Sequence, residues 1–94
     1  MTLQEQLEAA VRLAQVWAQI IPEIKPSQRQ FITWVTRYGA AATEAGIIAV
    51  NAWITKQQQR GRQIGNQPGQ LSENDIIRYA SGCMVSEMRE ASRG

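Results

Sequence analysis

The sequence contains no histidine and only one cysteine, Cys83, among its 94 residues. The absence of histidine removes the commonest general base and the commonest zinc ligand. A single cysteine cannot form an internal disulfide, and no histidine is present to activate it as a nucleophile. Because free cysteine is among the most buried residue types, we expect Cys83 to be a small core residue.

Long apolar segments are also missing, since no stretch approaches the roughly 20 apolar residues of a membrane-spanning helix. The densest apolar segment, Ala45–Ile54, is interrupted by Asn51. The first residues include Glu5, an acid where a secretory signal peptide would carry basic residues. We therefore expect no membrane association and a cytoplasmic location.

Motifs for catalysis or cofactor binding are absent as well. The acidic residues lie mostly at predicted helix starts and on polar faces, without the spacing of paired catalytic carboxylates or metal ligands. Gly61, Gly65 and Gly69 follow no predicted strand and form no phosphate-binding loop. The sequence predicts a protein that is not an enzyme and has no catalytic residue, metal or cofactor.

The residues that are present predict a single all-α domain over residues 1–94. A hydrophobic content of 44% in 94 residues supports one core, and the apolar residues recur at helical spacing. The predicted helices cover about residues 2–21, 27–38, 40–58 and 72–91, with a flexible loop at about 59–71. We expect a compact four-helix domain with one long basic loop between the third and fourth helices.

The first predicted helix has an unusually wide apolar face. Its apolar residues follow alternating steps of four and three, and a second row widens the face: Leu3, Leu7, Ala10, Ala14, Trp17, Ile21, then Leu13, Val16, Ile20. Burial against several helices of the same chain would explain this width, and so would contact with a second chain. On the polar face, the spacing of Glu8 and Arg12 predicts an ion pair.

Residues typical of helix ends, and small residues, indicate the bounds and the packing of the remaining helices. Ser27 and Ser72 are typical N-caps, and Gly39 is a typical end residue. The third helix is apolar on nearly all sides, which favours a central place, and Gly46 would allow close approach of another helix. The predicted core face of the last helix consists of Ile76, Ile77, Ala80, Cys83, Met84, Met88 and Ala91. Trp17, Trp34 and Trp53 lie on apolar faces and are expected in the core, although one of them could anchor a protein interface.

Charge is distributed unevenly along the chain. The net charge is −2 over residues 1–24, +5 over residues 25–62 and −1 over residues 63–94. Lys56, Arg60 and Arg62 lie in a segment rich in glutamine and glycine, from which they could reach phosphates. A solvated linker is the other interpretation of that segment. Lys25, Arg29 and Arg37 flank the second helix, where they could extend a basic surface or be ordinary surface charges.

Several residues together suggest a known family. The motifs Pro26-Ser27, Phe31-x-x-Trp34, Tyr38-Gly39 and Gly46-Ile47, and later the segment Asp75–Met84, resemble the DnaD-type domain of bacterial and phage replication-initiation proteins. The resemblance covers about residues 22–88 and omits the first helix. It implies a helical domain that contacts DNA and partner proteins near its C-terminal end. The sequence departs from the family in having Met88 near the place of a tryptophan.

The leading functional hypothesis is a small nucleic-acid-associated module, related to replication. It would contact the phosphate backbone of DNA through Lys56, Arg60 and Arg62, with support from three further residues, Lys25, Arg29 and Arg37. Such binding would depend weakly on base sequence and strongly on salt. The alternative is a phage- or plasmid-borne adaptor or inhibitor that binds a protein partner through the apolar first helix, or forms a homodimer.

Overall fold

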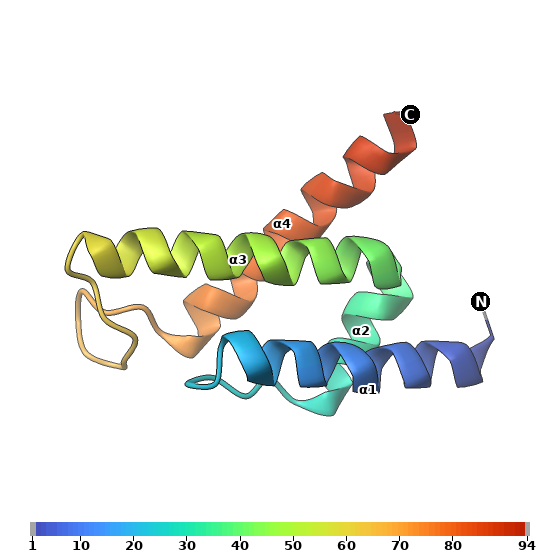
Figure 1. Cartoon of the computed structure of the whole chain (residues 1–94), viewed down its shortest axis with the longest axis horizontal. Coiled ribbons are helices and arrows are strands. Elements are labelled where there is room, and N and C mark those ends of the chain that lie inside the picture. The colour runs from blue at the N-terminus through green and yellow to red at the C-terminus, as the bar shows by residue number, and fades with distance from the viewer. Residues whose placement is uncertain (1, 94) are drawn as a thin grey trace.

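A computed structural model describes residues 2–93, so that Met1 and Gly94, the ends of the predicted domain, lie outside the described residues. The helices are α1 (Leu3–Ile20), α2 (Gln28–Tyr38), α3 (Ala40–Gln59) and α4 (Glu73–Arg93), shown in Figure 1. The described part of the chain contains no strand, and its one isolated β-bridge joins Ile64 and Leu71. The predicted all-α, four-helix fold is therefore confirmed. Between residues 2 and 93, no helix has the length and apolar character needed to cross a membrane.

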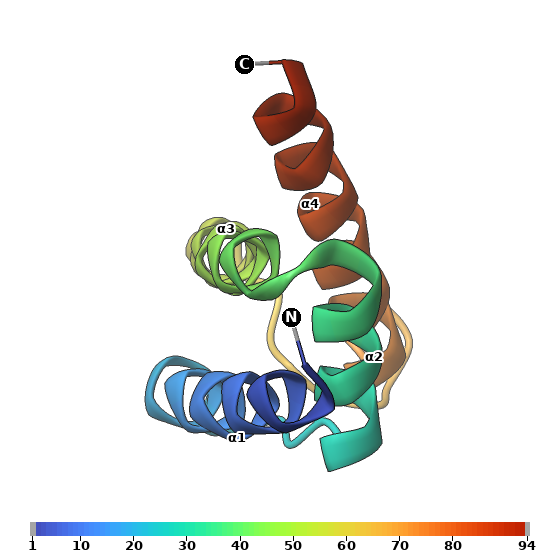
Figure 2. The same ribbon diagram turned by 90° about the vertical axis from the view of Figure 1, so that its right-hand side faces the viewer.

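The helix α3 occupies the middle of the fold and packs against all three other helices. The helices α1 and α3 run in the same direction, and α2 and α4 lie behind them (Figures 1 and 2). The helix α4 packs against α3 and α2, whereas no Cα atom of α4 lies within 8 Å of a Cα atom of α1 among the described residues. The last turns of α4 extend beyond the other helices, which explains why Ala91 is exposed and not in the core as predicted.

Side chains at the predicted boundaries satisfy backbone groups that would otherwise lack partners. The Ser27 hydroxyl accepts a hydrogen bond from the Gln30 N–H at 3.2 Å, and the Ser72 hydroxyl accepts one from the Asp75 N–H at 3.1 Å. Between α2 and α3, Gly39 has φ 87°, a conformation that residues with a side chain rarely adopt. The helix ends at these three residues could therefore be predicted from the sequence.

The core is organised around three aromatic side chains. Trp17 and Trp34 stack with ring centroids 5.7 Å apart, and Phe31 meets both rings edge-on. Both indole N–H groups have acceptors, since Trp17 donates to the Ile24 carbonyl at 2.9 Å and Trp34 to the Ser81 hydroxyl at 2.8 Å. The second bond joins α2 to α4, and the prediction of core positions for Trp17 and Trp34 is confirmed, each being 1% exposed.

The sequence suggested that Gly46 allows another helix to approach closely, and in the structure α4 lies close to α3 at this residue. A β-carbon at this position would overlap the Met84 Cγ and would lie 3.0 Å from the Met84 backbone nitrogen. Because real β-carbons are almost never so close to backbone, a side chain at position 46 would push α4 away from α3. The expectation that Gly46 permits close helix packing is confirmed.

The helix α1 departs from expectation in two ways. Its apolar face is covered only in part by the other helices, because Leu3 and Leu7, which belong to the predicted apolar stripe, are 69% and 38% exposed. In addition, Arg12 pairs with Glu44 of α3 at 2.6 Å, so the predicted ion pair within the helix to Glu8 is wrong. Arg12 pairs with Glu44 and not with Glu8 because the packing of α1 on α3 brings the Glu44 carboxylate within reach of the Arg12 guanidinium.

Candidate functional site

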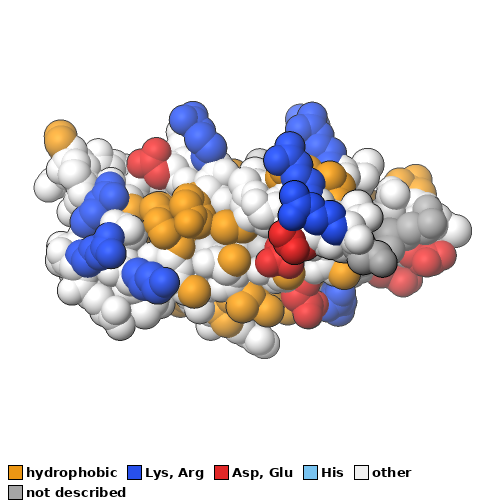
Figure 3. All heavy atoms as spheres, turned by 90° about the horizontal axis from the view of Figure 1, so that it is seen from above, with side chains coloured by type: hydrophobic (Ala, Val, Ile, Leu, Met, Phe, Trp, Pro, Cys, Tyr) orange, Lys and Arg blue, Asp and Glu red, His pale blue; other side chains and the backbone are white. Residues whose placement is uncertain are grey.

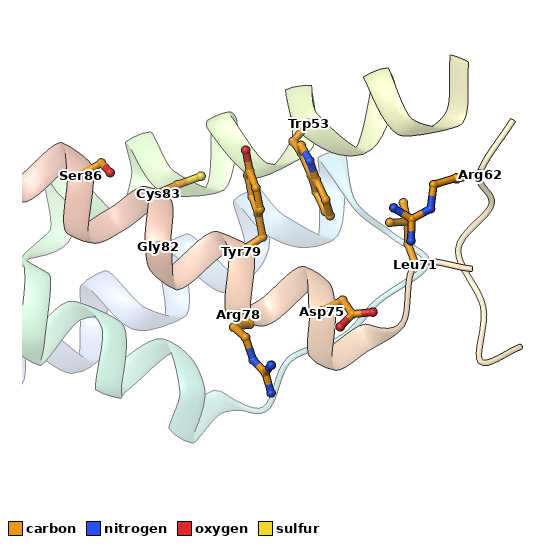
Figure 4. Close-up of a pocket in the computed structure, with 9 residues that line it drawn as sticks. All are labelled: Trp53, Arg62, Leu71, Asp75, Arg78, Tyr79, Gly82, Cys83 and Ser86. Carbon is orange, nitrogen blue, oxygen red and sulfur yellow. The ribbon is translucent and has the colours of Figure 1, made fainter. Parts of the chain in front are cut away.

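A groove of about 710 Å³ lies between α3, α4 and the segment that joins them (Figure 4). The segment spans residues 60–72 and is called here the α3–α4 connection. The side chains and backbone around the groove come from all three parts: Trp53, Arg62, Leu71, Asp75, Arg78, Tyr79, Gly82, Cys83 and Ser86. The groove adjoins the segment singled out by charge, since Arg62 and Leu71 of that segment line it.

A pair of stacked aromatic rings divides the groove. Trp53 of α3 and Tyr79 of α4 lie with ring centroids 4.0 Å apart and planes inclined by only 9°. Tyr79 is 42% exposed, and Trp53 is half-buried. The expectation that Trp53 is a core residue is therefore correct only in part, because its indole forms part of the groove wall. The sequence did not single out Tyr79 as part of a site.

Small residues surround the outer side of the Tyr79 ring. The turn of α4 that carries Gly82, Cys83 and Ser86 lies on the side of Tyr79 away from Trp53 (Figure 4). A β-carbon added to Gly82 would meet no atom within 4 Å, so the space above this turn is open. One face of the Tyr79 ring is thus covered by Trp53, and the other borders open groove.

The thiol of Cys83 is half-buried in the groove wall and is not the core residue expected from the sequence. Burial raises the pKa of this thiol, and the negative charge of Glu87 raises it further. A raised pKa leaves less of the nucleophilic thiolate at neutral pH. The environment of Cys83 therefore gives no support to nucleophilic chemistry.

The α3–α4 connection, predicted as a flexible loop, is closed on itself by backbone hydrogen bonds and joined to the core by one buried side chain. The Leu71 N–H donates to the Gln63 carbonyl at 2.9 Å, and the Gly65 N–H donates to the Leu71 carbonyl at 3.0 Å. The Leu71 side chain is fully buried. One buried leucine among polar residues was the signal in the sequence that could have indicated this anchor.

The side chain of Arg62 is held at one end of the groove. Its Nε donates to the Gly69 carbonyl and its Nη1 to the Gln57 Oε1, each at 3.2 Å. These bonds fix the orientation of the guanidinium and leave it exposed. An arginine oriented in this way pays less conformational entropy when it binds an anion.

Lys56 and Arg60 lie close to the same end of the groove. Lys56 lies in the last turn of α3, three residues after Trp53, and Arg60 directly follows the helix, seven residues after Trp53. This spacing places both on the side of the helix that carries Trp53. Within residues 2–93 the ion pairs are Arg12–Glu44 and Arg93–Glu90, so Lys56, Arg60 and Arg62 have no carboxylate partner there. Seen from above, Lys and Arg side chains lie beside a patch of hydrophobic side chains over the C-terminal half of α3 (Figure 3).

The other three predicted basic residues lie elsewhere. Lys25 belongs to the connection between α1 and α2, Arg29 to the first turn of α2 and Arg37 to its last turn, and all three are exposed. Arg37 precedes the start of α3, and Lys56 lies near its end, separated by most of a helix about 30 Å long. The structure therefore gathers half of the six residues and not the whole set. Arg78, which the sequence analysis did not select, joins the groove from α4.

No cluster of three or more potential metal ligands occurs in the part of the chain that the structure describes. Comparison with known proteins adds nothing to this site, because no known family, curated protein or solved structure matches the chain. The interpretation of the groove therefore depends on its own geometry and charge.

Proposed function

We propose that the protein is a small nucleic-acid-associated module that acts by binding, in the cytoplasm, and that contacts the phosphate backbone through Lys56, Arg60 and Arg62. The observation that carries the proposal is the gathering of these three cations, without carboxylate partners, beside an open groove with an exposed aromatic ring. A role in replication, implied by the resemblance to the DnaD-type domain, belongs to the same proposal.

The electrostatics of the site favour an anionic ligand that spans more than one charge. Arg62 and Arg78 line the groove with a single carboxylate, Asp75. Lys56 and Arg60, at the C-terminal end of α3, add positive charge near Arg62. Phosphates spaced along a strand could contact several of these cations at once, and each contact releases a counterion. Lys25, Arg29 and Arg37 could add contacts only to a ligand that continues around α2.

The experiment is a titration of fluorescently labelled oligonucleotides, single-stranded and duplex, followed by anisotropy at several salt concentrations. Three phosphate contacts from a single strand predict a slope of about −2 in the logarithm of affinity against the logarithm of salt. Between about 50 and 200 mM salt this corresponds to roughly a 20-fold loss of affinity. Absence of binding at the lowest salt would refute the proposal.

Two charge-matched double variants separate a defined site from general attraction to a basic protein. Lys56→Gln with Arg60→Gln, and Arg29→Gln with Arg37→Gln, each remove two positive charges from exposed positions. The first pair is expected to weaken binding and to reduce the salt slope by about 1.4, because two phosphate contacts are lost. The second pair is expected to have a much smaller effect. Equal losses from both pairs would contradict the assignment to the C-terminal end of α3.

A second candidate function is supported by the exposed apolar residues of α1. Leu3, Leu7 and Val11 are 69%, 38% and 50% exposed and follow one another at steps of four, which places them in one row on the helix. Such a row is typical of a helix surface that binds another helix. A protein-interaction module, either an adaptor or inhibitor of a larger assembly or a homodimer, would use this row.

The two candidates respond to different variants. Leu7→Glu with Val11→Glu is expected to abolish self-association in analytical ultracentrifugation if the row forms a homodimer, and to leave oligonucleotide binding unchanged. A protein that is monomeric at all concentrations would exclude the homodimer.

A further inference from the structure

The open face of the Tyr79 ring has the shape and surroundings of a site for a flat aromatic group. On one side Tyr79 stacks on Trp53 with centroids 4.0 Å apart, so the ring is held in place by a second aromatic ring. On its other side the groove is bordered by Gly82, Cys83 and Ser86, which are too small to cover it. A ring that is fixed on one face and open on the other can stack with an incoming ring at little cost in conformational entropy.

The charge around this ring distinguishes a nucleotide from other flat groups. Arg62, held by the Gly69 carbonyl and Gln57, stands at the end of the groove beyond Trp53. Lys56 in the last turn of α3 and Arg60 directly after the helix carry further positive charge near that end. At the other end, beyond Cys83, the charge of Glu87 opposes an anion. A nucleotide strand with its bases in the groove and its phosphates toward the Arg62 end would contact both the apolar and the charged residues of the site.

We infer that the groove holds an unpaired base of a single nucleic-acid strand, stacked on the outer face of Tyr79 above Gly82. This inference deepens the proposed function and rests on it, because the strand is held by the same cations. In a duplex the bases are stacked within the helix and their faces are not available, so the groove selects a single strand. Stacking is possible with every base, and the binding is therefore only weakly dependent on sequence.

Two ligands test the inference directly in the unmodified protein. Oligothymidylate and an abasic strand of the same length carry the same phosphates, but only the first has bases. Oligothymidylate is expected to bind roughly 5- to 150-fold more tightly, the range typical of one base stacked on an aromatic side chain. It is also expected to slow the alkylation of Cys83, the only cysteine of the chain, which lines the groove, whereas the abasic strand is not.

A substitution at Gly82 tests the place of the base without altering any charge or either aromatic ring. Gly82→Leu would fill the open space above the turn, where an added β-carbon meets no atom within 4 Å. Ala91→Leu is its control, because it enlarges an exposed side chain of the same helix at a position outside the groove. Gly82→Leu is expected to lower the affinity for oligothymidylate to that for the abasic strand, and Ala91→Leu to leave it near that of the natural protein. Tyr79→Leu, with folding checked by circular dichroism, is expected to have the same effect as Gly82→Leu.

The outcomes separate the inference from the function on which it rests. Equal, salt-dependent binding of the two strands, or unchanged binding by Gly82→Leu, would overturn the base site and leave phosphate binding in place. Tighter binding of a duplex than of the single strand would likewise overturn it. Failure of every oligonucleotide to bind would overturn both.

Discussion

Replacement of Gly46 by alanine tests the packing of α3 against α4, on which the groove depends. In an open helix the change would stabilise the protein by about 1 kcal/mol, because glycine is a poor helix former. At position 46, however, the new methyl group would overlap the Met84 side chain and lie 3.0 Å and 3.2 Å from the Met84 backbone nitrogen and α-carbon. Overpacking of this kind costs about 1–3 kcal/mol, and a helix backbone cannot move aside as a flexible side chain can.

The same substitution at Gly82 provides the control, because there the methyl group would meet no atom within 4 Å. Gly82→Ala is expected to raise the free energy of unfolding by about 1 kcal/mol, whereas Gly46→Ala is expected to leave it unchanged or lower it by up to about 2 kcal/mol. Thermal denaturation followed by circular dichroism resolves this, since each kcal/mol moves the Tm of such a domain by about 4–8 °C. A Gly46→Ala variant as stable as Gly82→Ala would refute the close contact between α3 and α4.

Further predictions concern the bonds around the groove. Ser81→Ala removes the acceptor of the buried Trp34 indole N–H and is expected to lower the free energy of unfolding by about 1–3 kcal/mol in urea denaturation, and a change under about 0.5 kcal/mol would contradict this. Arg62→Ala is expected to speed amide hydrogen exchange in residues 63–71 while global stability changes by less than about 0.5 kcal/mol, because the side chain is exposed. Glu87→Gln lowers the raised pKa of Cys83, so alkylation near pH 8 is expected to become faster as more thiolate forms, and an unchanged rate would show that burial alone sets the pKa.

The helices could be predicted from the sequence because local chemistry determines where they begin and end. Ser27, Gly39 and Ser72 act within a few residues of themselves, through hydrogen bonds to neighbouring N–H groups or a positive φ. The apolar pattern of α1 includes its three buried residues, Ala10, Leu13 and Trp17. It does not show that Leu3 and Leu7 are exposed, because the pattern does not say how far the neighbouring helices reach.

The groove could not be predicted in the same way. The helix α3 has apolar residues on nearly all sides, so its sequence does not show which side faces α4 and which faces solvent, and Trp53 was placed in the core. Tyr79 lies 26 positions along the chain from Trp53, and only the packing of α4 on α3 brings their rings together. The composition of the sequence shows that this segment is basic. It does not show that the Arg62 side chain donates a hydrogen bond to the Gly69 carbonyl, because that bond depends on the buried anchor at Leu71.

The separation of α1 from α4, whose Cα atoms nowhere lie within 8 Å of one another in the described chain, has a consequence for how the molecule opens. The groove belongs wholly to α3, α4 and their connection, whereas α1 packs on α2 and α3 and lines no part of the groove. Cooperative units of a native protein often coincide with such neighbouring helix pairs, and they can open separately. A ligand in the groove would then slow hydrogen exchange chiefly in α3 and α4, while the N-terminal helix could detach and return without releasing it.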